Sequence, residues 1–473
     1  MNKAILVALL SFTFTQFSNS KDAPEAWSQI LSGSGSIWQR CIAISPSNPQ
    51  IMYAGSITTG IWKSTNTGLN WVQVNNGLNA LNILAMEVSS SDPNYVYCGT
   101  GVGGSSAGIY VTTDGGNNWI QRNSGIIDSA GTQEFVINPT NPAIALVAVW
   151  NGTNFNNSVN GVYKTTNGGL SWTPSNAGMG ANKNVICLTR NPLNPNTIYC
   201  GTTFLVPNPP GIGPTYIYKS YDGGNTWGLF SNGLPAGSTD FNAVRTISVS
   251  NLDTSVVVAG VFQNTSNGGA FVSTNGGALW VLRNNGIPNA TGANIRSILI
   301  KPGSATEFFA GIDYPSGGGV YRTTDAGTTW TDFNGGVMLS NYIVRALAFR
   351  VASNTLYAGV SGTSGMGIYE YTFPPVGISD PTLYQPDEFS LSQNYPNPFN
   401  PQTTINYSVP VVSNVQLKVY NSAGMEIKTL VNRLMDRGKY SVEFDGTDLP
   451  SGIYFYKLTA GDHKFVKKMI LVK

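Results

Sequence analysis

Residues 108–119 read GIYVTTDGGNNW, and closely related phrases return five more times before residue 331. Each phrase has a Ser or Thr, then an Asp or Asn, then a Gly and finally a Trp, in the pattern S/T-x-D/N-x-G-x-x-W. The six copies are STNTGLNW (64–71), TTDGGNNW (112–119), TTNGGLSW (165–172), SYDGGNTW (220–227), STNGGALW (273–280) and TTDAGTTW (323–330). Their tryptophans are 48, 53, 55, 53 and 50 residues apart. This period is typical of the four-stranded blade of a β-propeller.

The residue types in the phrase predict a tight turn between two strands. An Asp or Asn side chain accepts hydrogen bonds from backbone N–H groups a few residues on, and Gly supplies the positive φ that closes the turn. The Trp begins the next strand, and we expect its ring to be buried between blades. The predicted turn residues are Asn66, Asp114, Asn167, Asp222, Asn275 and Asp325.

A predicted hairpin precedes each phrase, for example at 40–56 and 83–100, and a further one lies at 344–360. We name the hairpin strands A and B, the strand before the turn C and the strand after it D. The chain then has seven A-B-C units but only six turns. The segment AWSQILSGSGS (26–36) resembles NWVQVNNGL (70–78) and has no A-B-C unit before it. We therefore expect strand 26–31 to close the last blade of an all-β, seven-bladed propeller over residues 21–373, with a six-bladed ring as the alternative.

The repeated turn resembles the Asp-box, or BNR repeat, of sialidases, xyloglucanase-type glycosidases, sortilin-like receptors and photosystem-assembly propellers. The resemblance covers about residues 26–373. It implies the β-propeller fold of this superfamily. It implies no single activity, because the boxes occur in catalytic and non-catalytic relatives alike.

The beginning of the chain predicts export. Lys3 precedes an apolar run from Ala4 to Phe14, which is the layout of a secretory signal peptide over residues 1–20. No other stretch approaches the roughly 20 apolar residues that span a bilayer, so we expect no transmembrane segment in the mature chain. The cysteines are too few and too scattered for a disulfide framework, and we expect them to pack as small hydrophobic residues, with one bridge as the alternative. They are Cys41, Cys98, Cys187 and Cys200.

The end of the chain has a different pattern. After a Pro-rich linker at 374–388, residues 389–473 predict a small β-sandwich. The motifs YPNPFNP (395–401), LKVYNSAGMEIKTL (417–430), LPSGIYFYKL (449–458) and KKMILVK (467–473) follow one another in this stretch. It resembles the type A sorting domain of the type IX secretion system. The resemblance implies export across the outer membrane, followed by release or by attachment to surface lipopolysaccharide; an extra adhesive sandwich domain is the alternative.

Composition excludes several classes of function. Charged residues make up 11% of the chain and the formal net charge is +2, with no basic stripe, so a nucleic-acid partner is not expected. The only histidine, His463, lies in the C-terminal segment. The propeller therefore cannot use Ser-His-Asp, Cys-His or His-ligated metal chemistry. We expect neither a metal nor another cofactor.

Arginines recur at one position of the predicted A strands. Alignment by the following turns makes seven positions equivalent, near the mouth of the central channel: Arg40, Leu84, Gln133, Ile186, Arg245, Arg296 and Arg345. The four arginines belong to blades 1, 5, 6 and 7, which are neighbours in a closed ring. Clustered guanidinium groups can hold a carboxylate or sulfate, and the alternative is that they hydrogen-bond neighbouring carbonyl groups. Glu87 and Glu134 are candidate partners for such arginines, because buried carboxylates need a counter-charge.

Loops on the same predicted face carry further candidates. Four aromatic residues there suit ligand stacking or, alternatively, cap the blade edges: Trp150, Phe155, Phe204 and Tyr314. Three loop acids could supply the pair of carboxylates that a glycosidase needs, or are simply solvated: Asp128, Asp240 and Asp313.

We predict a secreted or cell-surface binding propeller that recognises a glycan or protein ligand, with the type IX secretion machinery as the partner of the C-terminal domain. A glycoside hydrolase is the second interpretation. The Phe/Tyr-Arg-Ile-Pro opening of sialidases is absent, and the xyloglucanase-type enzymes use two facing propellers where this chain has one. A third interpretation is an assembly factor that holds a protein segment.

Overall fold

A computed structural model describes most of the chain between residues 26 and 473. The described residues are 26–34, 36–101, 107–126, 131–150, 159–180, 183–204, 216–235, 242–263, 268–288, 294–313, 318–335, 342–361, 365–374, 388–411, 413–435 and 438–473. They fall into two compact units, divided after Phe373. Within the described ranges the regular structure is β-strand, with one short 3₁₀ turn at Val351–Ser353 and no α-helix.

The first unit contains seven four-stranded blades, each ordered from the innermost strand A to the outermost strand D. Blade 1 is β2 (Ile37–Ile44), β3 (Met52–Ser56), β4 (Gly60–Ser64) and β5 (Val72–Gln73); blade 2 is β6 (Ile83–Val88), β7 (Val96–Thr100), β8 (Ile109–Thr112) and β9 (Ile120–Gln121); blade 3 is β10 (Gly131–Ile137), β11 (Ala145–Trp150), β12 (Gly161–Thr165) and β13 (Thr173–Pro174). Blade 4 is β14 (Val185–Arg190), β15 (Ile198–Phe204), β16 (Ile217–Ser220) and β17 (Gly228–Leu229); blade 5 is β18 (Asn242–Val249), β19 (Val257–Gln263), β20 (Gly269–Ser273) and β21 (Val281–Leu282). Blade 6 is β22 (Ile295–Ile300), β23 (Phe308–Ile312), β24 (Gly319–Thr323) and β25 (Thr331–Asp332); blade 7 is β26 (Ile343–Arg350), β27 (Thr355–Ser361), β28 (Gly367–Thr372) and β1 (Ser28–Ser32). The predicted seven-bladed, all-β propeller is confirmed.

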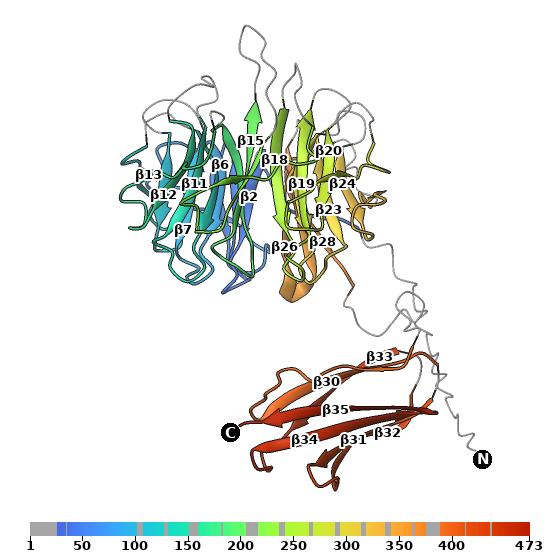
Figure 1. Cartoon of the computed structure of the whole chain (residues 1–473). Helices are drawn as coiled ribbons and strands as arrows, with labels where there is room; N and C mark the ends of the chain where they lie inside the picture. The colour runs from blue at the N-terminus through green and yellow to red at the C-terminus, as the bar shows by residue number, and fades with distance from the viewer. Residues whose placement is uncertain are drawn as a thin grey trace, which may run out of the picture. The chain divides into compact units, whose positions relative to one another are not determined.

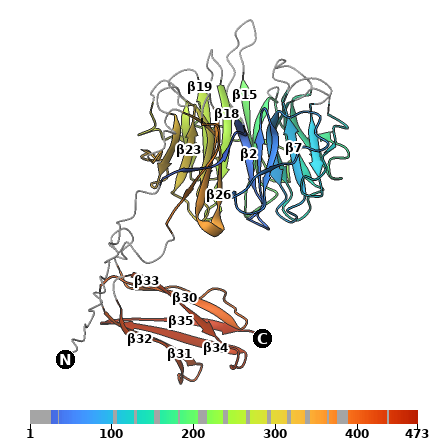
Figure 2. The same ribbon diagram turned by 180° about the vertical axis from the view of Figure 1, so that it is seen from behind.

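The ring closes where the two ends of the propeller chain meet. Strand β1 pairs antiparallel with β28, from Ser28 opposite Glu370 to Ser32 opposite Gly367, and so forms strand D of blade 7. Strands β2 and β26 then lie side by side although some 300 residues separate them in sequence (Figures 1 and 2). The N-terminal strand thus covers the edge that β28 would otherwise expose.

The tryptophans join each blade to the one before it. In six of the seven junctions, the Trp Nε1–H donates to a backbone carbonyl of the preceding D segment over 2.7–3.0 Å. Trp27 is one of these six, because it donates to Phe333 across the junction of blades 6 and 7. Trp71 is the exception: it is only half-buried and donates to Gly68 in its own turn. The buried Trp rings and their hydrogen bonds therefore fix the packing of neighbouring blades everywhere except between blades 7 and 1.

The repeated turns are held by side-chain hydrogen bonds. In blade 2, Thr112 donates to Asp114 Oδ1 (2.7 Å), which also accepts from the Asn118 backbone N–H (2.9 Å). The equivalent backbone bond is present in all six turns at 2.8–3.0 Å. The hydrogen bonds of Asn118, followed by that of Thr112, lower the pKa of Asp114 to about 2. These acids and amides have structural partners within their own turns.

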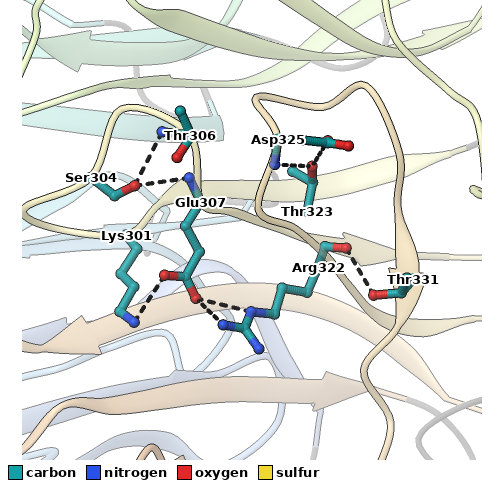
Figure 3. A network of polar contacts seen from close by, with 8 residues as sticks. All are labelled: Lys301, Ser304, Thr306, Glu307, Arg322, Thr323, Asp325 and Thr331. Atoms are coloured by element: carbon teal, nitrogen blue, oxygen red, sulfur yellow. Dashed lines mark hydrogen bonds and ion pairs between the residues drawn. The ribbon is translucent and has the colours of Figure 1, made fainter. Parts of the chain in front are cut away.

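A polar network strengthens blade 6. Glu307 lies between Lys301 (Nζ–Oε2 2.9 Å) and Arg322 (Nη2–Oε1 2.7 Å), as Figure 3 shows. Both cations also lie over the ring of Phe373, at 4.5 and 5.4 Å. Phe373 in turn stacks on Phe333 with the ring planes 10° apart. The last residues of the propeller are therefore anchored to blade 6 rather than left as a loose end.

The second unit is a β-sandwich with its own core. One sheet is β29 (Ser390–Leu391), β30 (Gln402–Val409) and β33 (Gly438–Asp445); the other is ordered β32 (Glu426–Met435), β31 (Ser413–Asn421), β34 (Gly452–Ala460) and β35 (His463–Leu471). Three of the sequence motifs meet here. Tyr456 donates to the Ser392 carbonyl (2.8 Å) and accepts from the Asn394 N–H (2.7 Å), and Asn397 accepts from the Ile470 N–H (2.9 Å). The YPNPFNP motif and the residues just before it are thus hydrogen-bonded to the other two motifs.

All four cysteines are buried on propeller strands. Burial raises the pKa of Cys98 and of Cys200. A buried, protonated thiol behaves as a small hydrophobic residue.

Candidate binding site at the mouth of the channel

The central channel is lined by the A strands of all seven blades. It holds a cavity of about 500 Å³ whose walls include Ile42 of blade 1 and Ala346 of blade 7. The repeated turns lie at one end of the channel, because their backbone N–H groups bond to the A-to-B turns, for example Gly115 to Asn94 (3.0 Å). The A strands therefore begin at the opposite end, which we call the mouth.

The arginine position of the sequence alignment is a β-bulge. In blades 2 to 7 the A-to-B register shifts by one residue at this position, for example between Val344 and Ala346 in blade 7. A bulge leaves one residue unpaired and re-aims its side chain. The six bulged residues are Leu84, Gln133, Ile186, Arg245, Arg296 and Arg345. The structure thus places three arginines at equivalent points near the mouth, on consecutive blades 5, 6 and 7.

Asp313, directly after β23, lies among these arginines. Arg296 donates from Nε to Asp313 Oδ2 (2.6 Å) and also pairs with it through Nη2, while Asn294 donates to the same oxygen (3.1 Å). Only 14% of the Asp313 side chain is exposed. Burial, then the charge of Arg296, lowers the pKa of Arg345 to about 10, whereas Asp313 raises it. The negative charge of Asp313 therefore pairs with one guanidinium group and also acts on a second one, and these two guanidinium groups repel each other.

Arg245 is oriented by an aromatic ring. Its guanidinium lies over Phe262 at 4.8 Å from the ring centroid. A guanidinium stacked in this way keeps its N–H groups in the plane available for bidentate hydrogen bonds. The stacking therefore holds the Arg245 guanidinium against a hydrophobic ring.

The other half of the channel carries charges deeper in the walls. Glu87 pairs with Arg190 across blade 3 (3.8 Å), and Arg190 also donates to the Ile137 carbonyl. Glu134 accepts from the Leu188 N–H (2.7 Å). Glu87 and Glu134 were candidate partners for the arginines of the mouth, but their hydrogen bonds and ion pair described here go to blades 3 and 4. Both glutamates lie further along their strands than the bulge. They are therefore deeper in the channel than the arginines of the mouth.

Glu87 is the most perturbed carboxyl group of the channel. Desolvation by the surrounding strands raises its pKa to about 7, although Arg190 and a hydrogen bond from Ile137 lower it. About 31% of its side-chain surface faces the channel, so the environment is enclosed but not dry. A carboxyl group of this kind gains or loses a proton near neutral pH.

Several predicted site residues lie outside the described part of the chain. They are Asp128, Asp240, Phe155 and Tyr314, and the side chains of Arg40 and Phe204 are also outside it. The backbone around Arg40 departs from the other blades, because the register of β2 shifts by several residues between Ile37 and Ile42. Trp150 ends β11 opposite Gly131 and is half-buried. Among the described residues, no three His, Cys, Asp or Glu side chains are grouped to hold a metal ion.

Sequence reasoning missed Arg190, Phe262 and Asn294. Arg190 is the last residue of its A strand, so an alignment of strand starts does not find it. An alignment of strand ends sets Arg190 beside hydrophobic residues such as Ile137 and finds one other charged residue at this position, Arg350 of blade 7. Phe262 and Asn294 carry no pattern of their own and become visible only through their contacts.

The C-terminal unit identifies the export route. The family model of the secretion system C-terminal sorting domain matches residues 393–473. The tail is a sorting domain of the type IX secretion system. The protein is therefore secreted or held at the cell surface, and its tail engages the type IX machinery. Of the residues that the structure describes, none belongs to a helix that could cross a membrane.

Solved structures similar to this chain are β-propellers. An ancestral GH74 enzyme has a TM-score of 0.52 at 16% identity, over 95% of this chain and 64% of the enzyme, so the chain spans less than two thirds of that protein. YCF48 bound to D1 peptide has a TM-score of 0.50 at 12% identity, over 74% of this chain and 97% of YCF48. PorZ of Porphyromonas gingivalis, a surface component of the type IX secretion system, has a TM-score of 0.35 at 12% identity, over 91% of this chain and 70% of PorZ. No curated protein sequence matches the chain. At these identities the similarity shows the fold alone.

Proposed function

We propose that the exported propeller is a binding protein whose channel mouth takes the anionic group of a glycan or protein ligand. The observation that carries the proposal is the arrangement of Arg245, Arg296 and Arg345 on three consecutive blades at one bulged position. The guanidinium groups of the first two are oriented by Phe262 and by Asp313, respectively. A carboxylate or sulfate entering between Arg296 and Arg345 would lower the repulsion that depresses the pKa of Arg345.

The same geometry does not favour hydrolysis. Asp313 is the one loop acid of the three candidates that the structure describes, and its carboxylate is engaged by Arg296 and Asn294. A general acid must have its carboxyl group free to reach the leaving-group oxygen, whereas this carboxylate already accepts hydrogen bonds from two side chains. Asp313 therefore suits the orientation of arginines better than proton transfer.

The proposal is tested by screening the purified chain against matched pairs of ligands. One arm compares sulfated or uronic-acid glycans with their neutral analogues, and the other compares peptides that end in a carboxylate with the same peptides amidated. We expect a charged member to bind at least about tenfold more tightly than its neutral partner, and its binding to weaken as salt is raised. A ligand that binds equally well in its neutral form would contradict the proposal.

A further inference from the structure

The larger sheet of the sorting domain has one face turned away from the core. Along β31 and β34, alternate side chains such as Leu417, Val419 and Tyr456 are buried in the sandwich. The intervening residues form the opposite face, which we call the outer face. Strand register places them in rows: Tyr420–Phe455–Lys468, Lys418–Lys457–Val466 and Gln416–Thr459–Lys464, with Ile453 opposite Ile470.

The outer face combines apolar and basic side chains. Ile453 and Val466 are 46% and 57% exposed, and Phe455 and Ile470 beside them are half-buried. These four residues lie on β34 and on β35, the edge strand of the sheet, and exposed apolar groups bordered by charged residues are a feature of interaction surfaces. Lys457 and Lys468 border this apolar group on two adjacent strands.

The charges of the outer face are nearly all positive. Four residues of its rows are lysines and one is an acid, Glu426, which stands opposite Tyr420; the lysines are Lys418, Lys457, Lys464 and Lys468. Glu426 pairs with Lys418 over 2.9 Å. Lys418 also stands directly opposite Lys457. Like charges directly opposite each other in a sheet are destabilising, and an acidic partner would relieve this cost.

We infer that the outer face is a docking surface for a protein of the export machinery that presents acidic side chains around an apolar centre. The inference rests on the sorting-domain match and is independent of the ligand of the propeller. A protein partner fits better than a membrane. The apolar residues lie in the paired rows of the sheet among the lysines, and Phe455 and Ile470 are half-buried, whereas binding to a bilayer requires apolar groups that reach about 5–10 Å into it.

Charge reversal on the outer face tests the inference in the full chain. We expect Lys457→Glu/Lys468→Glu to lower the amount of protein outside the cell by at least about tenfold, with accumulation in the periplasm. The new carboxylate at position 457 would stand opposite Lys418, so the variant replaces a like-charge pair with an opposite-charge pair and should keep the melting temperature of the parent. Loss of export without loss of stability is a result that a structural role for these lysines would not give.

A matched control lies in the same sheet. Lys428 and Arg433 are exposed on β32, but their register partners are Val419 and Val415, so they alternate with the outer face rather than belong to it. Lys428→Glu/Arg433→Glu carries the same change in net charge, and we expect its export to stay within about twofold of the parent. The conservative pair Lys457→Arg/Lys468→Arg should also be exported normally.

A second variant probes the apolar group of the outer face. Ile453→Ser/Val466→Ser changes two exposed residues, so little stability should be lost, and export should fall severalfold. Normal export of the charge-reversal variant or of the Ile453→Ser/Val466→Ser variant, with either protein folded, would overturn the inference. It would also be overturned by tight binding of the purified chain to vesicles of anionic phospholipid, or by a dimer that the charge reversal dissociates, because a membrane or a second copy would then be the occupant.

Discussion

The two halves of the channel are built on the same strand and the same bulge, yet they use charge differently. In blades 5 to 7 the bulged residues are Arg245, Arg296 and Arg345, at the mouth. In blades 2 to 4 the bulged residues carry no charge, and Glu87 and Arg190 lie deeper in the wall. We call these the mouth arginines and the wall charges.

The difference between the two sets lies in their partners. The wall charges bond to one another and to backbone groups of the next blade, as Glu134 does with Leu188. Arg296 pairs with Asp313, whose charge also raises the pKa of Arg345, and the third mouth arginine lies over Phe262. A charge that bridges blades contributes to the stability of the ring, whereas clustered arginines can accept a further anion. The comparison predicts large stability effects in the wall and large binding effects at the mouth.

The largest effect should come from opening the ring that both halves need. Deleting residues 21–33 removes β1 and Trp27. Loss of a buried Trp alone costs roughly 3–5 kcal/mol, and the exposed edge of β28 should promote association. Thermal unfolding and size-exclusion chromatography measure both effects. A deletion variant as stable and as monomeric as the parent would disprove the role of β1 in closure.

The second-largest loss of stability is expected when Arg190, the cation among the wall charges, is replaced. Arg190→Met removes the ion pair of Glu87 and the hydrogen bond to Ile137. We expect the free energy of unfolding to fall by about 2–4 kcal/mol, because a carboxylate enclosed by protein loses its partner. Denaturant unfolding gives this value. Arg345→Met is the matched change at the mouth and should cost clearly less; equal losses would remove the distinction between the two halves.

A smaller effect on stability is expected from the titration of the Glu87 carboxyl group. Its pKa of about 7 in the folded protein lies above the ordinary value of 4.5, so the folded state holds this proton more tightly than the unfolded state. Its contribution to stability is therefore present at low pH and is lost as pH rises through about 5 to 7. Glu87→Gln should flatten the fall in melting temperature between about pH 5 and pH 8. Asp114→Asn is the control, since the pKa of Asp114 is about 2.

The smallest effect concerns the acid of the mouth. Asp313→Asn keeps a hydrogen-bond acceptor for Arg296 but removes the negative charge beside Arg345. An anionic ligand should then bind more tightly, by about threefold, because the charge of the ligand replaces the one removed beside the two arginines. Titration calorimetry with the charged ligand from the screen measures the affinity. The control is Asp253→Asn, in an A-to-B turn at the other end of the channel, which should leave the affinity unchanged. Weaker binding by Asp313→Asn would mean that the carboxylate itself contacts the ligand.

The repeat made the fold predictable, because the same turn and the same Trp recur at the blade period. The bulge position was predictable for the same reason: a bulge common to six blades keeps Arg245, Arg296 and Arg345 in register with Leu84. The pairing of Asp313 with Arg296 was not, since it joins a loop end to a strand start within one blade and follows no period. Arg190 escaped detection because its partner, Glu87, lies two blades away.

The proposal that the mouth arginines bind an anion is tested most directly by one double variant measured in two ways. Arg245→Gln/Arg345→Gln keeps hydrogen-bond donors at both bulges but removes two positive charges. Affinity for the charged ligand and thermal unfolding are measured on the same samples, with Leu84→Gln, at the same bulge position in blade 2, as the control. We expect binding to fall by at least about 100-fold while the free energy of unfolding changes by about 1 kcal/mol or less. A loss of stability with unchanged affinity would show that the mouth arginines, like the wall charges, serve the fold.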